Sequence, residues 1–97
     1  MRYDILFAPE AVEDLDNLKA NVRTTVRDAI DQHLRHEPTK VSKSRIKRLR
    51  GLSRPQYRLR VGEVRVFYDV RGRTVDVLAI VPKSDAGQWL ESKGEPQ

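Results

Sequence analysis

The stretch Tyr57–Val81, YRLRVGEVRVFYDVRGRTVDVLAIV, decides the fold of this 97-residue chain. Apolar and polar residues alternate along most of it, which is typical of β-strands. The alternation is interrupted at Gly62-Glu63 and at Gly72-Arg73, and glycine followed by one further residue suits a two-residue hairpin turn. The stretch therefore predicts three antiparallel strands, over residues 57–61, 64–70 and 74–81.

Two-residue turns also fix the register of these strands. The pairs next to the turns are Val61–Val64 and Val70–Val75, and the pairing extends from them along the strands. Without interruption, it continues through Tyr57–Tyr68, Arg58–Phe67, Leu59–Val66, Arg60–Arg65, Tyr68–Val77, Val66–Ala79 and Val64–Val81. One sheet face is then almost wholly apolar and needs a cover; it holds Tyr57, Leu59, Val61, Val64, Val66, Tyr68, Val75, Val77, Ala79 and Val81. The opposite face holds Arg58, Arg60, Arg65, Phe67, Asp69, Asp76, Leu78 and Ile80.

A helical hairpin near the N-terminus is the predicted cover. Apolar residues recur at steps of three and four between positions 12 and 34, which indicates amphipathic helices. Pro9 suits a first helical position, and Asn21 can cap a second helix. We therefore expect one helix over residues 9–19 and another over residues 21–36.

The remaining segments complete an α+β fold in one domain, residues 1–97. Residues 2–7 alternate like a further strand, with core candidates Tyr3, Ile5 and Phe7. Pro38 ends the second helix and opens an extended basic connection that reaches Gly51. Ser84 can cap a short C-terminal helix that carries Trp89 and Leu90 as packing residues. Residues 92–97 look like a frayed tail.

Positive charge is concentrated in the middle of the chain, which has a net charge of +5. Residues 38–60 hold nine Lys or Arg and no Asp or Glu, whereas residues 1–37 carry a net charge of −3 and residues 61–97 a net charge of −1. Charge this focused usually has a polyanionic partner; the alternative is a solvated loop. We expect five residues of the connection to bind RNA phosphates: Lys43, Arg45, Lys47, Arg48 and Arg50.

Several classes of protein and of site are not expected. The chain has no cysteine, which fits a reducing cytosol. Acidic residues stand where a signal peptide needs an apolar core, and no apolar run is long enough for a membrane span, so we expect a cytoplasmic protein without membrane contact. His33 and His36 lie near the predicted end of the second helix, where partly charged histidine is favoured. Because no further ligands are evident around them, we expect no metal site.

Three arginines are predicted to meet on the polar sheet face. Arg60 lies opposite Arg65, with Arg58 diagonal to both, and like charges in such pairs are unfavourable by roughly a few tenths of a kcal/mol or more. Folding does not require this arrangement, but a phosphate held between the guanidinium groups would relieve the repulsion through bidentate hydrogen bonds. The alternative is that the arginines splay into solvent or pair with nearby acids, namely Glu63, Asp69 and Asp76.

The whole pattern resembles the RelE/ParE superfamily, small bacterial toxins of type II toxin–antitoxin systems. The resemblance covers residues 2–90 and rests on LRG (49–51), YRLRVGEVRVFYDV (57–70) and VDVLAIVPKSDA (75–86), in this order after a strand and a helical hairpin. It implies a RelE-like fold, a cognate antitoxin and no small-molecule cofactor. RelE-like members cut mRNA in the ribosome, whereas ParE-like members poison DNA gyrase.

The resemblance also implies catalytic residues. In RelE-like nucleases, two cationic residues one apart follow LRG, a further arginine lies on the next strand, and another cation follows the last strand. These positions correspond here to Arg58, Arg60, Arg65 and Lys83. Several members also need a Tyr or His near the C-terminus, where this sequence has neither.

The chemistry that these residues support is cleavage of RNA without a metal. Arginines can stabilise the charge on the phosphorane formed when the 2′-OH attacks, but arginine is a poor proton acceptor, so the general base and acid stay unassigned. We expect an mRNA endoribonuclease toxin acting at the ribosome and inhibiting translation. The alternatives are a gyrase inhibitor without nuclease activity and a degenerate member that only binds its antitoxin.

Overall fold

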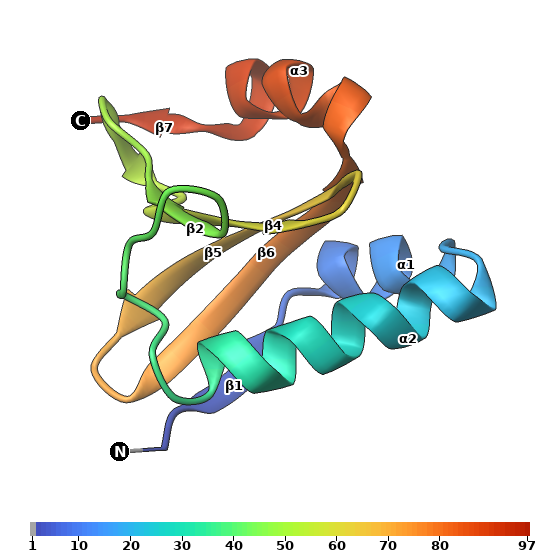
Figure 1. Ribbon diagram of the computed structural model, residues 1–97. Helices are drawn as coiled ribbons and strands as arrows, with labels where there is room; N and C mark the ends of the chain where they lie inside the picture. Colours follow the sequence, from blue (N-terminus) through green and yellow to red (C-terminus); the bar gives the residue numbers. More distant parts are fainter. Residues whose placement is uncertain (1) are drawn as a thin grey trace.

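The computed structural model describes residues 2–97. Its elements in chain order, shown in Figure 1, are β1 (Asp4–Phe7), α1 (Pro9–Asp16), α2 (Ala20–Ala29), a π-helical turn η1 (Ile30–Leu34), β2 (Ile46–Arg48), β3 (Leu52–Arg54), β4 (Tyr57–Val61), β5 (Val64–Arg71), β6 (Thr74–Pro82), α3 (Lys83–Lys93) and β7 (Glu95–Pro96). Five strands form one sheet in the order β1-β6-β5-β4-β2, and β3 pairs with β7 apart from it. The α+β architecture predicted from the sequence is confirmed.

The strands β4, β5 and β6 are the three predicted from the sequence, and both turns are confirmed. Gly62 and Gly72 have positive φ angles of +58° and +59°, a conformation that glycine adopts without a steric cost. The predicted register of β4 with β5 is correct for all five pairs, including Arg60 opposite Arg65.

The first strand departs from the expected antiparallel sheet. β1 pairs with β6 in parallel, so the sheet is mixed. Tight turns force antiparallel pairing between the strands they join, but the chain passes through two helices and several strands between β1 and β6. The direction of β1 is therefore not fixed by a turn.

A β-bulge in β6 changes the predicted faces of its second half. Phe67 pairs with Ala79 and Tyr68 with Val77, so Leu78 is an extra residue. Beyond it, Val66 pairs with Ile80 rather than Ala79, and Val64 with Pro82 rather than Val81. The predictions for Ala79, Ile80 and Val81 were therefore wrong. Ile80 enters the core under the helices, while Ala79 and Val81 lie on the opposite face.

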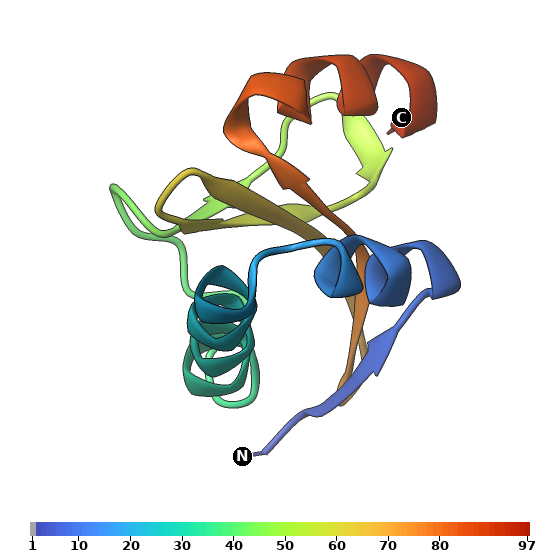
Figure 2. The same cartoon turned by 90° about the vertical axis from the view of Figure 1, so that its right-hand side faces the viewer.

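The helices α1 and α2 cover one face of the sheet, which we call the helix-side face (Figure 2). Ala11 and Leu15 of α1 and Val26 of α2 are buried there against sheet residues such as Leu59 and Val66. Tyr3 and Ile5 pack at the edge of this core as predicted, whereas Phe7 is 36% exposed. The strong core lies on this side because it receives the apolar faces of two helices and of the sheet.

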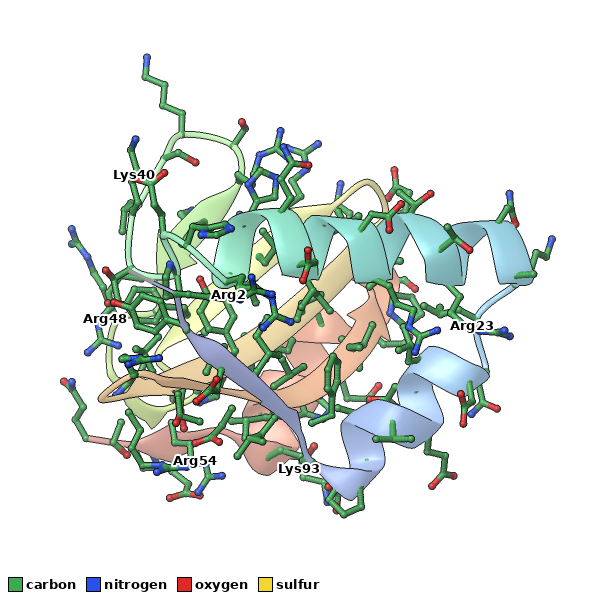
Figure 3. All side chains as sticks on the ribbon, turned by 90° about the horizontal axis from the view of Figure 1, so that it is seen from below. Arg2, Arg23, Lys40, Arg48, Arg54 and Lys93 are labelled. Atoms are coloured by element: carbon green, nitrogen blue, oxygen red, sulfur yellow. The ribbon has the colours of Figure 1, made fainter. Side chains whose placement is uncertain are left out.

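The helical hairpin is held at its turn by Arg23, whose position between α1 and α2 is visible in Figure 3. Its guanidinium donates to the carbonyl oxygens of Leu15, Asp16 and Leu18, at 3.3, 3.3 and 3.0 Å. These carbonyls lie at and just after the end of α1, where backbone acceptors lack helical partners. Asn21 does not cap the second helix, because α2 begins at Ala20 with Lys19 in the capping position.

The basic connection is more ordered than predicted. β2 within it pairs antiparallel with β4, and Ile46 is buried in the core. β3 pairs with β7, so residues 95–96 form a strand where a frayed tail was expected. Three short strands, β2, β3 and β7, were missed because none of them shows apolar alternation.

The C-terminal helix α3 covers part of the other sheet face, which we call the arginine face (Figure 1). It begins at Lys83, with Pro82 rather than Ser84 in the capping position. Among residues 2–97, no helix is long and apolar enough to cross a membrane.

Candidate nucleic-acid interface

The arginine face carries the predicted cluster on two adjacent strands. Arg58 and Arg60 project from β4, and Arg65 from β5. Arg60 and Arg65 are directly opposed, and Arg58 is opposed to Phe67 on the same face. The predicted juxtaposition of the three side chains on one sheet face is therefore confirmed, while their catalytic roles stay predictions.

The three arginines differ in burial and in bonding. Arg65 is only 7% exposed, and its Nη1 donates to the carbonyl oxygens of Gly62 at 2.8 Å and Val64 at 3.1 Å. Arg58 is half-buried, and its buried Nε has no hydrogen-bond partner. Arg60 is exposed. Arg65 is thus fixed against the turn, and the buried Nε of Arg58 has no partner among the described residues.

The cluster lacks carboxylate partners. Burial lowers the pKa of Arg58, and the charges of Arg65 and Arg60 lower that pKa further, which indicates that the three guanidinium groups repel each other. Among the residues that the structure describes, none of the three makes an ion pair. The pairs formed are Arg35–Asp31, Lys40–Glu37, Arg54–Asp69 and Arg71–Asp76.

The alternative that nearby acids neutralise the cluster is therefore wrong. Asp69 lies 3.2 Å from Arg54 and accepts the backbone N–H of Gln56 at 2.7 Å. Asp76 is held by Arg71 at 3.2 Å. An unpaired donor that is buried costs free energy unless a ligand satisfies it, so the cluster is suited to an anion from outside the chain.

The apolar half of the arginine face is covered rather than open. Trp89 of α3 stacks on Phe67 with ring centroids 4.9 Å apart and planes 6° from parallel. Phe67, Ala79 and Val81 form a second buried cluster, against which Leu49 and the α3 residues Ala86, Trp89 and Leu90 pack. Phe67 lies on the same face as the arginines, as the predicted register has it, but it is buried. The packing role predicted for Trp89 is confirmed.

Lys83 lies at the end of the sheet where the arginines cluster. Lys83 is the first residue of α3, and its backbone N–H donates to the carbonyl oxygen of Glu63 at 2.7 Å. Pro82, which precedes it, pairs with Val64. Lys83 is exposed and lines a shallow hollow with Glu63 and Ser84. The hollow therefore joins the start of α3 to the turn that holds Arg65.

The five basic residues predicted to bind RNA do not share one surface. Lys47 pairs with Arg58 and extends the arginine face onto β2. Arg48 points to the other side, where its guanidinium lies 5.2 Å from the ring centroid of Tyr57 and donates to the carbonyl oxygen of Gln56 at 3.0 Å; Figure 3 shows its place at the margin of the molecule. Lys43 and Arg50 are exposed in loops.

Arg45 forms a contact that the sequence did not predict. Its Nη1 lies 2.9 Å from Nε2 of His33, which belongs to the π-helical turn η1. The two residues are twelve positions apart across an irregular connection, so no periodic pattern signals their meeting. Their contact joins the end of the helical hairpin to the basic segment.

Comparisons with known proteins agree on this fold. A family model described as the ParE toxin of the type II toxin–antitoxin system parDE matches residues 5–87. Curated protein sequences gave no match.

Solved structures similar to the chain include RelE in complex with RelB. The Methanococcus jannaschii complex has 24% identity and a TM-score of 0.67, with 87% of this chain and 96% of that chain covered. The Mycobacterium tuberculosis RelBE2 complex has 25% identity, a TM-score of 0.65 and coverage of 84% and 99%. The complex from Pyrococcus horikoshii OT3 has 25% identity, a TM-score of 0.64 and coverage of 86% and 97%. The chain belongs to the ParE toxin family of type II toxin–antitoxin systems, within the RelE/ParE superfamily.

Proposed function

We propose that this toxin is a metal-independent endoribonuclease that cleaves mRNA at the ribosome and so inhibits translation. The observation that carries the proposal is the unpaired cation cluster of Arg58, Arg60 and Arg65, in which a buried Nε lacks a partner. Arg65 supports the turn through its two backbone hydrogen bonds, but the repulsion among three neighbouring guanidinium groups is unfavourable for the fold. A scissile phosphate would satisfy the free donors and neutralise the repulsion.

The chemistry divides between the toxin and its target. The 2′-OH attacks the adjacent phosphorus, the 5′-oxygen leaves, and a 2′,3′-cyclic phosphate forms. Arg58 and Arg65 stabilise the negative charge that develops on the phosphorane oxygens, and Lys83 supplies a further cation at the same end of the sheet. The general base and general acid are not assigned to residues of this chain. The ribosome would position the reacting strand.

The proposed partners follow from the same surface. A cognate antitoxin would inhibit the toxin by placing acidic side chains against the cluster, and the similar solved structures include complexes of RelE with RelB. Lys47 adds a phosphate contact beside Arg58 on the route of the RNA strand. The setting of such a reaction is the cytoplasm.

The decisive experiment compares two arginines of the same sheet face. Purified wild type, Arg58→Gln and Arg71→Gln are added to a translating lysate, and the 5′ ends of the mRNA are mapped. We expect discrete cuts, slowed about a hundredfold or more in Arg58→Gln and unchanged in Arg71→Gln, since Arg71 is paired with Asp76 at the far end of β5. Equal cutting by wild type and Arg58→Gln would refute the assignment.

A second candidate function is inhibition of DNA gyrase without RNA cleavage. Two observations favour it: the family model that matches is the ParE one, and α3 contains neither Tyr nor His. Intact mRNA together with loss of supercoiling by purified gyrase would select this function. Harmless overexpression without an antitoxin, with neither effect, would instead identify a member that only binds its antitoxin.

A further inference from the structure

A hollow of about 570 Å³ borders Arg60, next to the cation cluster. Its walls come from the C-terminal part of the second helix, from the start of the basic segment and from the end of β4. The polar groups that line it are Asp28, Gln32, His33, Ser44, Arg45 and Arg60.

The contact between His33 and Arg45 defines the chemistry of the hollow. A guanidinium nitrogen can only donate, so the 2.9 Å contact from Arg45 Nη1 requires Nε2 of His33 to be an acceptor. The imidazole is then neutral and carries its proton on Nδ1. Burial lowers the pKa of His33, and the charge of Arg45 lowers that pKa further.

The other charged groups around His33 do not neutralise this pair. Glu37 and Lys40 line a smaller hollow on its other side, where they pair with each other at 3.5 Å. Asp28 lies one helical turn before His33 and makes no ion pair within residues 2–97. Within the same residues Arg45 also makes no ion pair, and its guanidinium hydrogen-bonds only to the imidazole. A guanidinium that is held by a neutral imidazole keeps its full charge for an incoming anion.

We propose that this hollow binds a phosphate of the RNA strand next to the one held by the cation cluster, with Arg45, Arg60 and protonated His33 as its donors. The proposal rests on RNA being the ligand of the proposed function. Arg60 carries the link between the two sites, because it belongs to the cluster by its pairing with Arg65 and also lines the hollow. A strand that crosses Arg60 would therefore place neighbouring phosphates on both sides.

Phosphate binding at this site takes up a proton. The anion replaces the imidazole as the acceptor for Arg45, which frees Nε2 to be protonated and to donate to the same phosphate. The protonated form of His33 is disfavoured in the free toxin and favoured in the complex, so RNA raises the pKa of His33. Binding consequently tightens as the pH falls through the titration of His33, by up to about tenfold per pH unit while one proton is taken up.

The experiment uses the two histidines of the chain, His33 and exposed His36, as probe and internal reference. Their imidazole C2–H signals are followed by NMR between pH 8 and pH 5.5, with and without a 2′-O-methyl RNA oligonucleotide, which cannot be cleaved because it lacks the nucleophile. His33→Gln assigns the signals. We expect the RNA to shift the midpoint of His33 to higher pH and to leave that of His36 in place.

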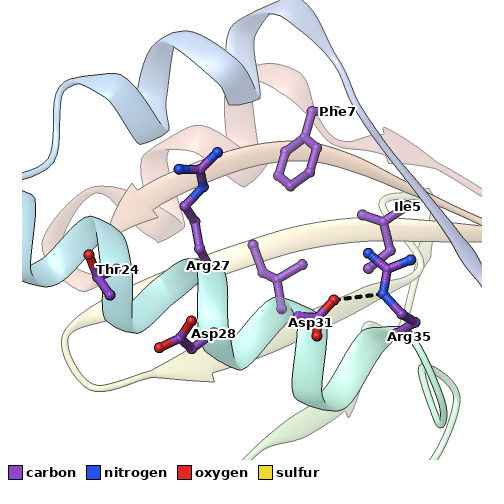
Figure 4. A pocket seen from close by; sticks show the side chains of 8 residues that line it. Ile5, Phe7, Thr24, Arg27, Asp28, Asp31 and Arg35 are labelled. Carbon is purple, nitrogen blue, oxygen red and sulfur yellow. Dashed lines mark hydrogen bonds and ion pairs between the residues drawn. The ribbon is translucent and has the colours of Figure 1, made fainter.

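Affinity is measured in parallel by fluorescence anisotropy with the same oligonucleotide. Arg45→Ala is expected to bind about tenfold or more weakly, as for a lost hydrogen bond to a charged group, and His33→Gln to lose the tightening at low pH. The matched control is Arg27→Ala, which removes one positive charge from α2 at a different hollow, between α2 and β1 (Figure 4). Arg27→Ala should bind within about twofold of the wild type.

The outcomes separate this inference from the proposed function. Cleavage of mRNA without a shift of His33, or equal loss of affinity in Arg45→Ala and Arg27→Ala, overturns the second phosphate site alone. A shift of His33 in a protein that cuts no mRNA overturns the nuclease and keeps the site. A shift caused by an acidic peptide but not by RNA overturns the proposal in favour of a protein ligand, and no shift with any anion overturns it outright.

Discussion

The two faces of the sheet are built from the same strands but differ in composition. The helix-side face is apolar along its length, and residues such as Leu59, Val66 and Val77 have no exposed surface. The arginine face is divided: Phe67, Ala79 and Val81 form an apolar part that lies under α3, and the other half, on β2, β4 and the start of β5, carries the cations of the cluster and Lys47. Burial of apolar surface accounts for the first face, whereas nothing in the stability of the fold accounts for the cationic half of the second.

The two faces hold residues with different roles. The apolar residues of the helix-side face are needed for folding, and the cations of the arginine face are available to a ligand. Strained or mutually repelling groups that persist in a fold are typical of functional sites. Mutations on the helix-side face should therefore lower stability. Mutations of Arg58 and Arg60 should lower activity while stability stays level or rises, whereas Arg65 also supports the turn through its backbone hydrogen bonds.

The largest expected effect on stability is at Leu59, at the centre of the helix-side face. Leu59→Ala removes a fully buried side chain and should lower the free energy of unfolding by about 2–5 kcal/mol. Urea denaturation followed by circular dichroism measures this loss. Leu6→Ala is the control, because Leu6 lies on the same sheet but is 53% exposed; its change should stay within about 0.5 kcal/mol. Similar losses for both variants would contradict the assignment of the core.

The next effect concerns the bulge that sends Ile80 to one face and Ala79 to the other. The carboxylate of Asp14 in α1 accepts the backbone N–H of Ile80 at 2.9 Å. Asp14→Ala leaves this N–H without its partner and should cost about 1–3 kcal/mol of unfolding free energy. Asp14→Asn keeps a carbonyl acceptor and should recover part of it.

The control for Asp14 is its exposed neighbour. Glu13→Ala removes a carboxylate from the same helix without touching the bulge. If Glu13→Ala is as destabilising as Asp14→Ala, helix charge rather than the hydrogen bond to the bulge explains the loss.

The same bulge marks the limit of what the sequence could predict. Around the two glycine turns, alternation fixed the register, and all five pairs of β4 with β5 are correct. From Val77 to Val81 every residue is apolar, so alternation is lost and either face is compatible with each side chain. The partner that stabilises the bulge is Asp14, sixty-six positions away, which no local pattern can reveal.

The candidate site was predictable to a similar degree. The opposition of Arg60 and Arg65 follows from one turn and was found. The packing of α3 over Phe67 was not predicted, because the sequence indicates that a helix forms there but not which surface it packs on. The contact of His33 with Arg45 depends on the path of an irregular connection, for which periodicity gives no information.

A smaller and opposite effect is expected in the cation cluster. Arg58→Met keeps most of the side-chain volume while removing a buried unpaired nitrogen and the repulsion from Arg60 and Arg65. The free energy of unfolding should rise by about 0.5–1 kcal/mol, whereas the proposed cleavage of mRNA should slow as in Arg58→Gln. Arg71→Met is the comparison: it breaks the exposed pair with Asp76 and should lower stability slightly or leave it unchanged. A loss of stability in Arg58→Met would mean that Arg58 serves the fold.

The smallest effect concerns Asp69, an acid of the arginine face that pairs with Arg54. Burial raises the pKa of Asp69, and the hydrogen bond from Gln56 and the charge of Arg54 only partly oppose this. Because the folded state then binds the proton more tightly than the unfolded state, the contribution of Asp69 to stability is greatest below its unfolded pKa and is lost as the pH rises through the folded value. Asp69→Asn, which keeps an acceptor for Gln56 and cannot ionise, should lack this loss. Its stability relative to the wild type should therefore increase between pH 3 and pH 6 in urea denaturation and stay constant above. If the stability of Asp69→Asn relative to the wild type decreases over that range, the ion pair with Arg54 outweighs the effect of burial. The charges of this part of the arginine face would then stabilise the fold rather than destabilise it.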